Sequence, residues 1–326
     1  MTDVVTSEVS GDAKNTVEQA ETGDELTVTE RALQRISVTA PYFALENLTE
    51  LGHGIVSATV PATPPTNPET GVMEAAQVAR HLAILGSCAA ALDRDDNKRH
   101  HYLATKAHYS RLSTSGSEPS APGEPLEAEA LASWVDRRTA RSLVKLSTRS
   151  GHGLYVLDVE YTVLAPKMFS RLHPPQPSAV EGEDGEATDV PTELGFDVTP
   201  TPLGVDVDCG PIPPSMCAGH FPDYPAAPVA IVMGQLCRGA GLGLASYLGI
   251  PDLRYRIEAG HVLATRLAAA GQRLALRTRY QEPVAGGHRI TGVAEADGET
   301  IGEVDVIMST TTPRPEPVEG YEGMPC

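Results

Sequence analysis

Apolar and polar residues alternate along several short stretches of this chain, and each half also contains one long stretch rich in alanine and glycine. In the first half the pattern predicts a helix and six strands: a helix at about Gly71–Leu92 and strands at Arg35–Thr39, Gly54–Val60, Tyr102–Leu112, Leu126–Trp134, Ala140–Thr148 and Leu154–Leu164. The second half repeats this order: a strand at Gly204–Cys209, a helix at Ala230–Leu248 and strands at Arg254–Arg266, Arg273–Tyr280, His288–Asp297 and Thr300–Ser309. The same elements in the same order indicate an internal repeat.

Composition divides the chain into five segments. We expect a disordered acidic tail at 1–30, a first domain at 31–172, an acidic linker at 173–193, a second domain at 194–312 and a loose tail at 313–326. The formal net charge is -18, and the three polar segments carry about -15 of it. The acidity therefore belongs to tails and linker, and we expect no nucleic-acid partner.

The order of the repeat does not by itself identify a chemistry, but one motif does. His220-Phe221-Pro222 is followed by Pro225 and Pro228, directly before the second long helix. This resembles the active-site signature of the FabZ/FabA family of β-hydroxyacyl-carrier-protein dehydratases. The resemblance implies an α+β chain of two tandem hotdog domains, each a curved antiparallel sheet wrapped around a central helix.

In that family an acidic residue lies fourteen positions after the histidine, where this chain has Gly234. An offset of 160 between the halves, which aligns Pro68 with Pro228, places Glu74 over Gly234 and Val60 over His220. The first half then has the acidic residue without the histidine, and the second half has the histidine without the acidic residue. The resemblance implies one composite site, with His220 of the second domain as base and Glu74 of the first as acid.

The resemblance also implies a set of substrate-binding positions around the second helix. The backbone N–H groups of the first helical turn are free to donate to a thioester carbonyl. We expect binding residues at Gln77, Tyr224, Pro228, Val229, Ala230 and Gly234. No cofactor is implied, and five cysteines without a C-x-x-C pair suggest neither a disulfide framework nor a zinc site, so no metal is expected.

The resulting hypothesis is a dehydratase that removes water from a 3-hydroxyacyl thioester in fatty-acid or polyketide biosynthesis. The substrate would be carried by an acyl carrier protein or by coenzyme A. The alternatives are a hotdog acyl thioesterase and a non-catalytic protein that binds an acyl chain or a synthase. We expect a cytoplasmic protein with no membrane partner, because no targeting or spanning segment is evident. It would be a monomeric pseudo-dimer or a dimer of that unit.

Overall fold

The computed structural model describes residues 26–112, 123–173, 195 and 197–311. Most of the predicted acidic tail, the linker and the C-terminal tail lie outside the described residues. Residues 26–30, assigned by sequence to the tail, belong to the folded part, because helix α1 begins at Val28.

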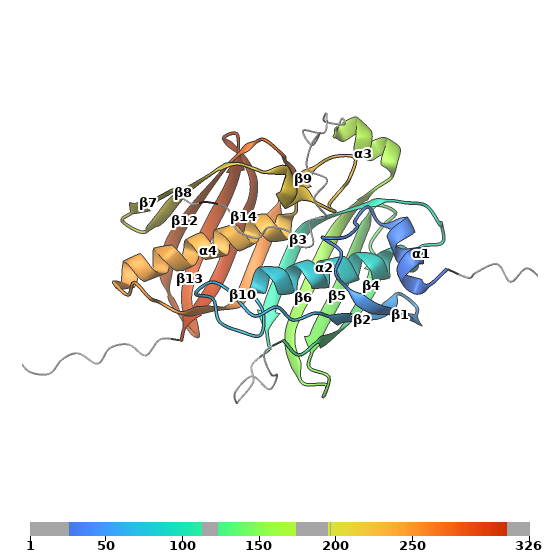
Figure 1. The fold of residues 1–326 in the computed structure, drawn as a ribbon, viewed down its shortest axis with the longest axis horizontal. Helices are drawn as coiled ribbons and strands as arrows, with labels where there is room; N and C mark the ends of the chain where they lie inside the picture. The colour runs from blue at the N-terminus through green and yellow to red at the C-terminus, as the bar shows by residue number, and fades with distance from the viewer. Residues whose placement is uncertain (1–25, 113–122, 174–194, 196, 312–326) are drawn as a thin grey trace, which may run out of the picture.

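Each half contributes six strands to one sheet and one long helix (Figure 1). The first half has α1 (Val28–Arg35), β1 (Glu46–Gly52), β2 (Ile55–Val60), α2 (Ala75–Leu92), β3 (His101–Arg111), β4 (Leu126–Trp134), β5 (Thr139–Ser147), β6 (Gly153–Leu164) and α3 (Pro166–Leu172). The second half has β7 (Asp197–Thr201), β8 (Gly204–Pro211), the 3-10 helix η1 (Pro214–Cys217), β9 (Ala226–Ala227), α4 (Val229–Leu248), β10 (Tyr255–Ala264), β11 (Ala268–Ala269), β12 (Arg273–Val284), β13 (Gly287–Ala296) and β14 (Glu299–Thr310).

Twelve strands form one continuous antiparallel sheet across both halves. Their order is β1-β2-β4-β5-β6-β3-β10-β14-β13-β12-β8-β7, so the second half repeats the first in reverse around the β3–β10 seam. Figure 1 shows α4 over the second half and α2 over the first half on one face of this sheet, and the two helices contact each other. The predicted fold class, two tandem hotdog domains, is confirmed.

Small residues let the sheet approach both central helices closely. A Cβ on Gly86 of α2 would lie 2.6 Å from the Tyr161 hydroxyl, and one on Gly241 of α4 would lie 2.2 Å from the Tyr255 ring. Both helices are long and apolar enough to cross a membrane by composition, yet 78% and 67% of their apolar windows are buried inside the fold. Their apolar character is therefore explained by core packing.

Three predictions near the first helix need correction. The expected strand at Arg35–Thr39 is wrong: α1, which starts at a reciprocal capping box of Thr27 and Glu30, continues to Arg35, and of the next four residues only Val38 makes a β-bridge, to His220. The edge strand β1 was missed because only one of its seven residues is buried, so it shows no alternation. Helix α2 begins at Ala75 rather than Gly71.

The helix starts also correct the alignment of the repeat. Glu74 is the N-cap of α2 with φ -61° and ψ 139°, and Pro228 is the N-cap of α4 with φ -61° and ψ 138°. The two N-caps are structural equivalents, which gives an offset of 154 instead of 160. The counterpart of Gly234, which is the sixth residue of its helix, is therefore Arg80 and not Glu74.

Candidate active site

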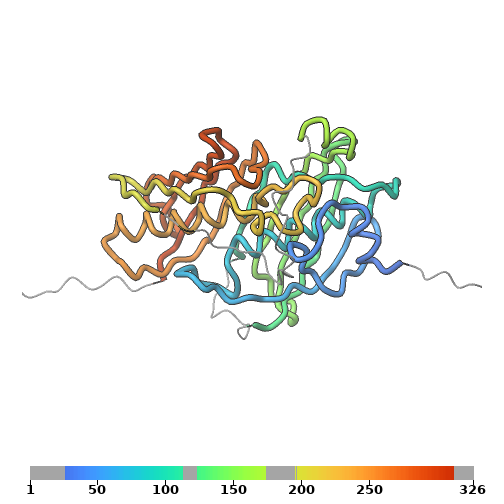
Figure 2. Tube along the Cα trace, turned by 45° about the horizontal axis from the view of Figure 1, so that its top comes forward, coloured from blue at the N-terminus to red at the C-terminus, as the bar shows by residue number. Residues whose placement is uncertain are grey.

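The loop that carries His220 is held by the first half of the chain. The Thr39 N–H donates to the Gly219 carbonyl at 2.8 Å, and the Phe221 N–H donates to the Ser37 carbonyl at 3.2 Å. Figure 2 shows this loop crossing toward the N-terminal segment. Gly219 has φ +74°, and a Cβ there would lie 2.3 Å from the Thr39 oxygen, so this position requires glycine.

His220 itself is fixed in one tautomer. Its Nδ1 lies 2.9 Å from the Ala226 carbonyl, which can only accept, so Nδ1 carries the hydrogen and Nε2 keeps its lone pair. Burial lowers the pKa of His220 to about 4, against the opposing effect of the Ala226 hydrogen bond. The Tyr42 ring meets the imidazole edge-on at 5.1 Å between centroids. The result is a neutral, oriented imidazole with a free basic nitrogen at neutral pH.

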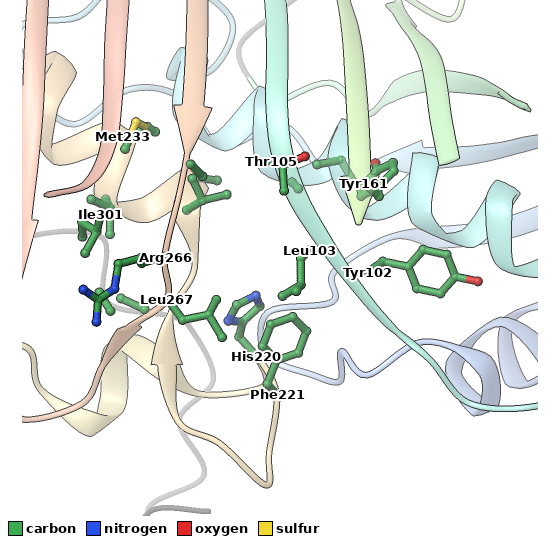
Figure 3. A pocket seen from close by; sticks show the side chains of 18 of the residues that line it. Tyr102, Leu103, Thr105, Tyr161, His220, Phe221, Met233, Arg266, Leu267 and Ile301 are labelled. Atoms are coloured by element: carbon green, nitrogen blue, oxygen red, sulfur yellow. The ribbon is translucent and has the colours of Figure 1, made fainter. Parts of the chain in front are cut away.

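His220 lines a cavity of about 160 Å³ between the two central helices and the β3–β10 seam, which we call the main cavity. Figure 3 shows the imidazole between Leu267 and Leu103, with Met233 and Tyr161 further along the walls. Most of the exposed lining is apolar. No aspartate or glutamate is among the described residues that line it.

Glu74 lies elsewhere. It lines a second, smaller pocket of about 20 Å³, which we call the side pocket, together with Gln77 and Arg80 from the first half and Gly234, Gln235 and Arg238 from the second. His220 does not line the side pocket, and Glu74 does not line the main cavity. The composite site predicted from the sequence is not assembled: imidazole and carboxyl face different pockets.

Arg80 is the counterpart of Gly234 in the first half, and the sequence analysis did not single it out. Its guanidinium lies 5.6 Å from the centroid of the Tyr42 ring, the same ring that meets His220, and its Nη2 lies 3.2 Å from Nε2 of His81. Aligning the helix starts instead of Pro68 and Pro228 would have found it.

The predicted substrate-binding residues divide between several places. Val229 and Ala230, the first two residues of α4, line the main cavity, whereas Gln77 and Gly234 line the side pocket, to which Ala230 also contributes. Pro228 is the N-cap of α4. Tyr224 packs in an aromatic cluster, 6.0 Å from Phe169 and 5.4 Å from His173 between ring centroids.

A second buried ionisable group lies in the segment before α2. Glu69 is 5% exposed, and its Oε1 accepts a hydrogen bond from the Ala75 N–H at 2.7 Å, at the start of the helix. Burial raises the pKa of Glu69 to about 8, against the effect of that hydrogen bond. Glu69 stands between Pro68 and Thr70, outside any alternating apolar pattern, so the sequence did not predict that its side chain is buried.

No group of three or more histidine, cysteine, aspartate or glutamate side chains that could hold a metal ion occurs among the described residues. The four described cysteines, Cys88, Cys209, Cys217 and Cys237, are free thiols.

With this geometry in view, the chain can be compared with known proteins. The sequence matches no protein-family model and no curated protein. Among solved structures, it is similar to the Mycobacterium avium subs paratuberculosis tesB protein, with a TM-score of 0.53 and 13% identity over 82% of this chain and 96% of that one. It is also similar to the 12:0-ACP thioesterase from Umbellularia californica, with a TM-score of 0.52 and 9% identity over 79% of this chain and 95% of that one. These are double hotdog structures. At such identities the likeness shows the fold.

The prediction of a dehydratase is corrected by these findings. The solved structures that match most of the chain with a TM-score above 0.5 include structures named as thioesterases, among them a putative oleoyl thioesterase from Lactobacillus plantarum (TM-score 0.51, 12% identity, 79% of this chain and 99% of that one), and they do not specifically support a FabZ/FabA dehydratase. The catalytic pair that the dehydratase required is also split between two pockets.

Proposed function

We propose that this chain hydrolyses acyl thioesters in the main cavity, with His220 as the general base. The observation that carries this proposal is the fixed tautomer of His220: because Nδ1 donates to the Ala226 carbonyl, the basic Nε2 is left to act in a cavity that the imidazole lines. The likeness in fold to structures named as thioesterases supports it.

In the proposed reaction, Nε2 of His220 removes a proton from a water molecule as the water oxygen attacks the thioester carbonyl carbon. The carbon–sulfur bond then breaks, the acyl group leaves as a carboxylic acid, and the proton passes from the imidazole to the departing sulfur. A neutral imidazole is the form that can accept this proton, and burial keeps His220 neutral near pH 7.

The start of α4 supplies the electrostatic part of the site. Val229 and Ala230 are the first two helical residues, and their N–H groups have no acceptor inside the helix, whereas the Ile231 and Val232 N–H groups bond to the Pro228 carbonyl. Both residues line the main cavity. Their N–H groups, at the positive end of the helix dipole, would stabilise the oxyanion that forms on the carbonyl.

The absence of a carboxyl group from the described lining favours hydrolysis over dehydration. A thiol has a pKa of about 8.5, so it can leave as a thiolate without a strong acid beside it. A β-hydroxyl group must instead be protonated as it leaves, because hydroxide is the base of water, with a pKa of about 15.7. The residues around His220 therefore suit thioester hydrolysis and lack the acid that dehydration needs among the described lining.

The walls of the cavity suit an apolar acyl chain. Ile84 of α2, Val232 and Met233 of α4, and Ile301 of β14 contribute apolar side chains from both halves. Such a surface would bind a hydrocarbon chain by excluding water. The substrate class we propose is an acyl thioester of coenzyme A or of an acyl carrier protein.

The test is release of free thiol from a series of saturated acyl-CoA and acyl-carrier-protein substrates of increasing chain length. His220→Gln should lower kcat/KM by roughly 10² to 10⁴, the usual contribution of a general base, while leaving the fold intact by circular dichroism. Glu74→Gln is the matched control and should retain wild-type hydrolysis. The proposal fails if wild type releases no thiol from any member of either series, or if His220→Gln hydrolyses as fast as wild type.

A further inference from the structure

Two histidines face solvent at the centre of the twelve-stranded sheet. His108 on β3 and His261 on β10 are Cα partners in the antiparallel register that joins the halves, and both are exposed. Their ring centroids lie 4.1 Å apart with the planes inclined at 30°. Because β3 and β10 are equivalent strands of the two halves, this pair lies at the pseudo-twofold axis that relates the halves.

An aspartate flanks each histidine on its outer side. Asp158 of β6 is the Cα partner of His108, and Asp305 of β14 is the Cα partner of His261. Both carboxylates are held by an arginine: Arg141 Nε donates to Asp158 Oδ1 at 2.7 Å, and Arg289 Nε donates to Asp305 Oδ1 at 3.0 Å. The result is a symmetrical row across the sheet, with two imidazoles inside and two oriented carboxylates outside.

We propose that His108 and His261 form a binding site for one divalent transition-metal ion of the borderline class, Cu²⁺, Ni²⁺ or Zn²⁺. Imidazole nitrogen is a preferred ligand of all three ions. A metal–nitrogen bond is about 2.0–2.1 Å long, so two nitrogens bound to one ion lie at most about 4.2 Å apart. The rings are stacked with centroids 4.1 Å apart, so both exposed side chains would rotate to aim one nitrogen each at a shared ion, which their directly opposed positions on β3 and β10 allow.

The surroundings of the pair fit a cation. A carboxylate next to a ligating histidine accepts the hydrogen of the other ring nitrogen, which fixes the tautomer and makes the ligating nitrogen more basic. Asp158 and Asp305 are placed beside the two rings for that role. The nearest lysine along the strand, Lys106, is paired with Glu160 at 3.3 Å, so its charge is offset.

The site has two protein ligands, in keeping with the finding that no cluster of three occurs in the described part of the chain. Water would complete the coordination of the ion. Such a site is open and exchangeable, unlike a closed structural zinc site with four protein ligands. It would cross-link the two halves at their seam, because one ligand comes from each.

The experiment is isothermal titration of the untagged full chain with Cu²⁺, Ni²⁺ and Zn²⁺, with Mg²⁺ as a hard-ion control. We expect one equivalent of each transition metal to bind, with Cu²⁺ tightest in keeping with the Irving–Williams order, and no heat from Mg²⁺. His108→Gln and His261→Gln should each raise the Kd more than the roughly 10-fold to 100-fold that loss of a supporting carboxylate causes. Asp158→Asn should give that smaller change.

The matched control is His53→Gln, since His53 is another exposed histidine of the first half and lies away from the seam. It should bind as wild type does. The site is disproved if neither His108→Gln nor His261→Gln changes the Kd, because the ion then binds to other groups. It is equally disproved if no heat of binding appears for any of the three ions. The measurement reads binding alone, so its outcome is independent of whether the chain hydrolyses thioesters.

Discussion

The segments that precede α2 and α4 occupy equivalent places in the two halves and carry opposite chemistry. The second-half segment presents His220 to the main cavity and is held by Ser37 and Thr39 of the first half. The first-half segment buries Glu69 and is held in turn by the second half, where the Thr70 N–H donates to the Tyr255 carbonyl at 2.8 Å. Docking is reciprocal, but one segment alone presents a base to the main cavity.

This difference shows that the two halves of a fused repeat can keep the same backbone geometry after their functional side chains have diverged. Both N-caps have the same dihedral angles within a degree, and neither uses a side-chain cap. The residue six positions further is Arg80 in one helix and Gly234 in the other. Shared backbone geometry therefore keeps the loops in place while side chains diverge.

The largest expected effect comes from preventing the His220 loop from docking. In Gly219→Ala the new Cβ would lie 2.3 Å from the Thr39 carbonyl oxygen, on a residue with φ +74°. We expect a loss of at least about 4 kcal/mol in the free energy of unfolding, within the exceptional range for one substitution, together with loss of thiol release. Urea unfolding and the hydrolysis assay measure the two effects.

Gly249→Ala separates the clash from backbone strain. Gly249 has φ +67°, and a Cβ there would meet nothing within 4 Å. This variant should lose about 1 to 2 kcal/mol from the left-handed conformation alone and keep its hydrolytic activity. Equal losses in the two variants would show that docking of the His220 loop on the first half is dispensable.

The next effect concerns Glu69 and the alkaline side of the stability profile. Its folded pKa of about 8 lies above its ordinary value of 4.5, so its contribution to stability is complete below pH 4.5 and is lost as pH rises through 8. Between pH 5 and 8 the wild type should lose roughly 3 kcal/mol through this group. Glu69→Gln should flatten that slope in urea titrations, whereas Glu74→Gln should leave it as steep as in wild type.

The pH dependence of hydrolysis tests the His220 side of the comparison. Because burial lowers the pKa of His220 to about 4, the free base persists well below the ordinary histidine value of 6.5. The acid limb of kcat/KM should therefore fall near pH 4, with circular dichroism confirming that the chain is still folded there. An acid limb near 6.5 would mean that the imidazole is solvated and that the cavity does not bury it.

The smallest effect is expected at Tyr42, which orients His220 from the first half. Replacing Tyr42 with leucine removes an edge-on aromatic contact worth about 0.5 to 1.5 kcal/mol, so kcat/KM should fall by roughly 2-fold to 12-fold. Tyr247→Leu is the control, because Tyr247 stacks on Tyr280 instead and is 48% exposed. If both variants keep full activity, the Tyr42 contact does not position the base.

The sequence predicted the fold well because both halves follow hydrophobic periodicity. Strands such as β4 alternate buried and exposed residues along their length. The long helices are rich in small apolar residues, which is typical of a helix packed against a sheet in the core. The His220 motif identified a residue that lines the main cavity before α4. These features depend on local order along the chain.

The site was predicted less well, because it depends on alignment between halves and on contacts distant in sequence. Pro68 resembles Pro228 in type, yet the helix after Pro68 starts seven residues later and the helix after Pro228 starts at the next residue, so Glu74 was placed over the wrong position. The contact between Tyr42 and His220 joins residues 178 positions apart, and nothing in either neighbourhood signals it. Burial of Glu69 likewise follows from the docked second half.

The β3–β10 seam has a consequence for how such a chain can change over time. In an assembly of two identical subunits, every substitution appears twice, and the seam forms only above a threshold concentration of protein. Here the seam lies within one polypeptide. Its strength is independent of dilution, and a substitution alters one side of the molecule while the other stays as it was. The Glu69 carboxyl can thus be buried in the first half without a matching change at the His220 imidazole of the second half.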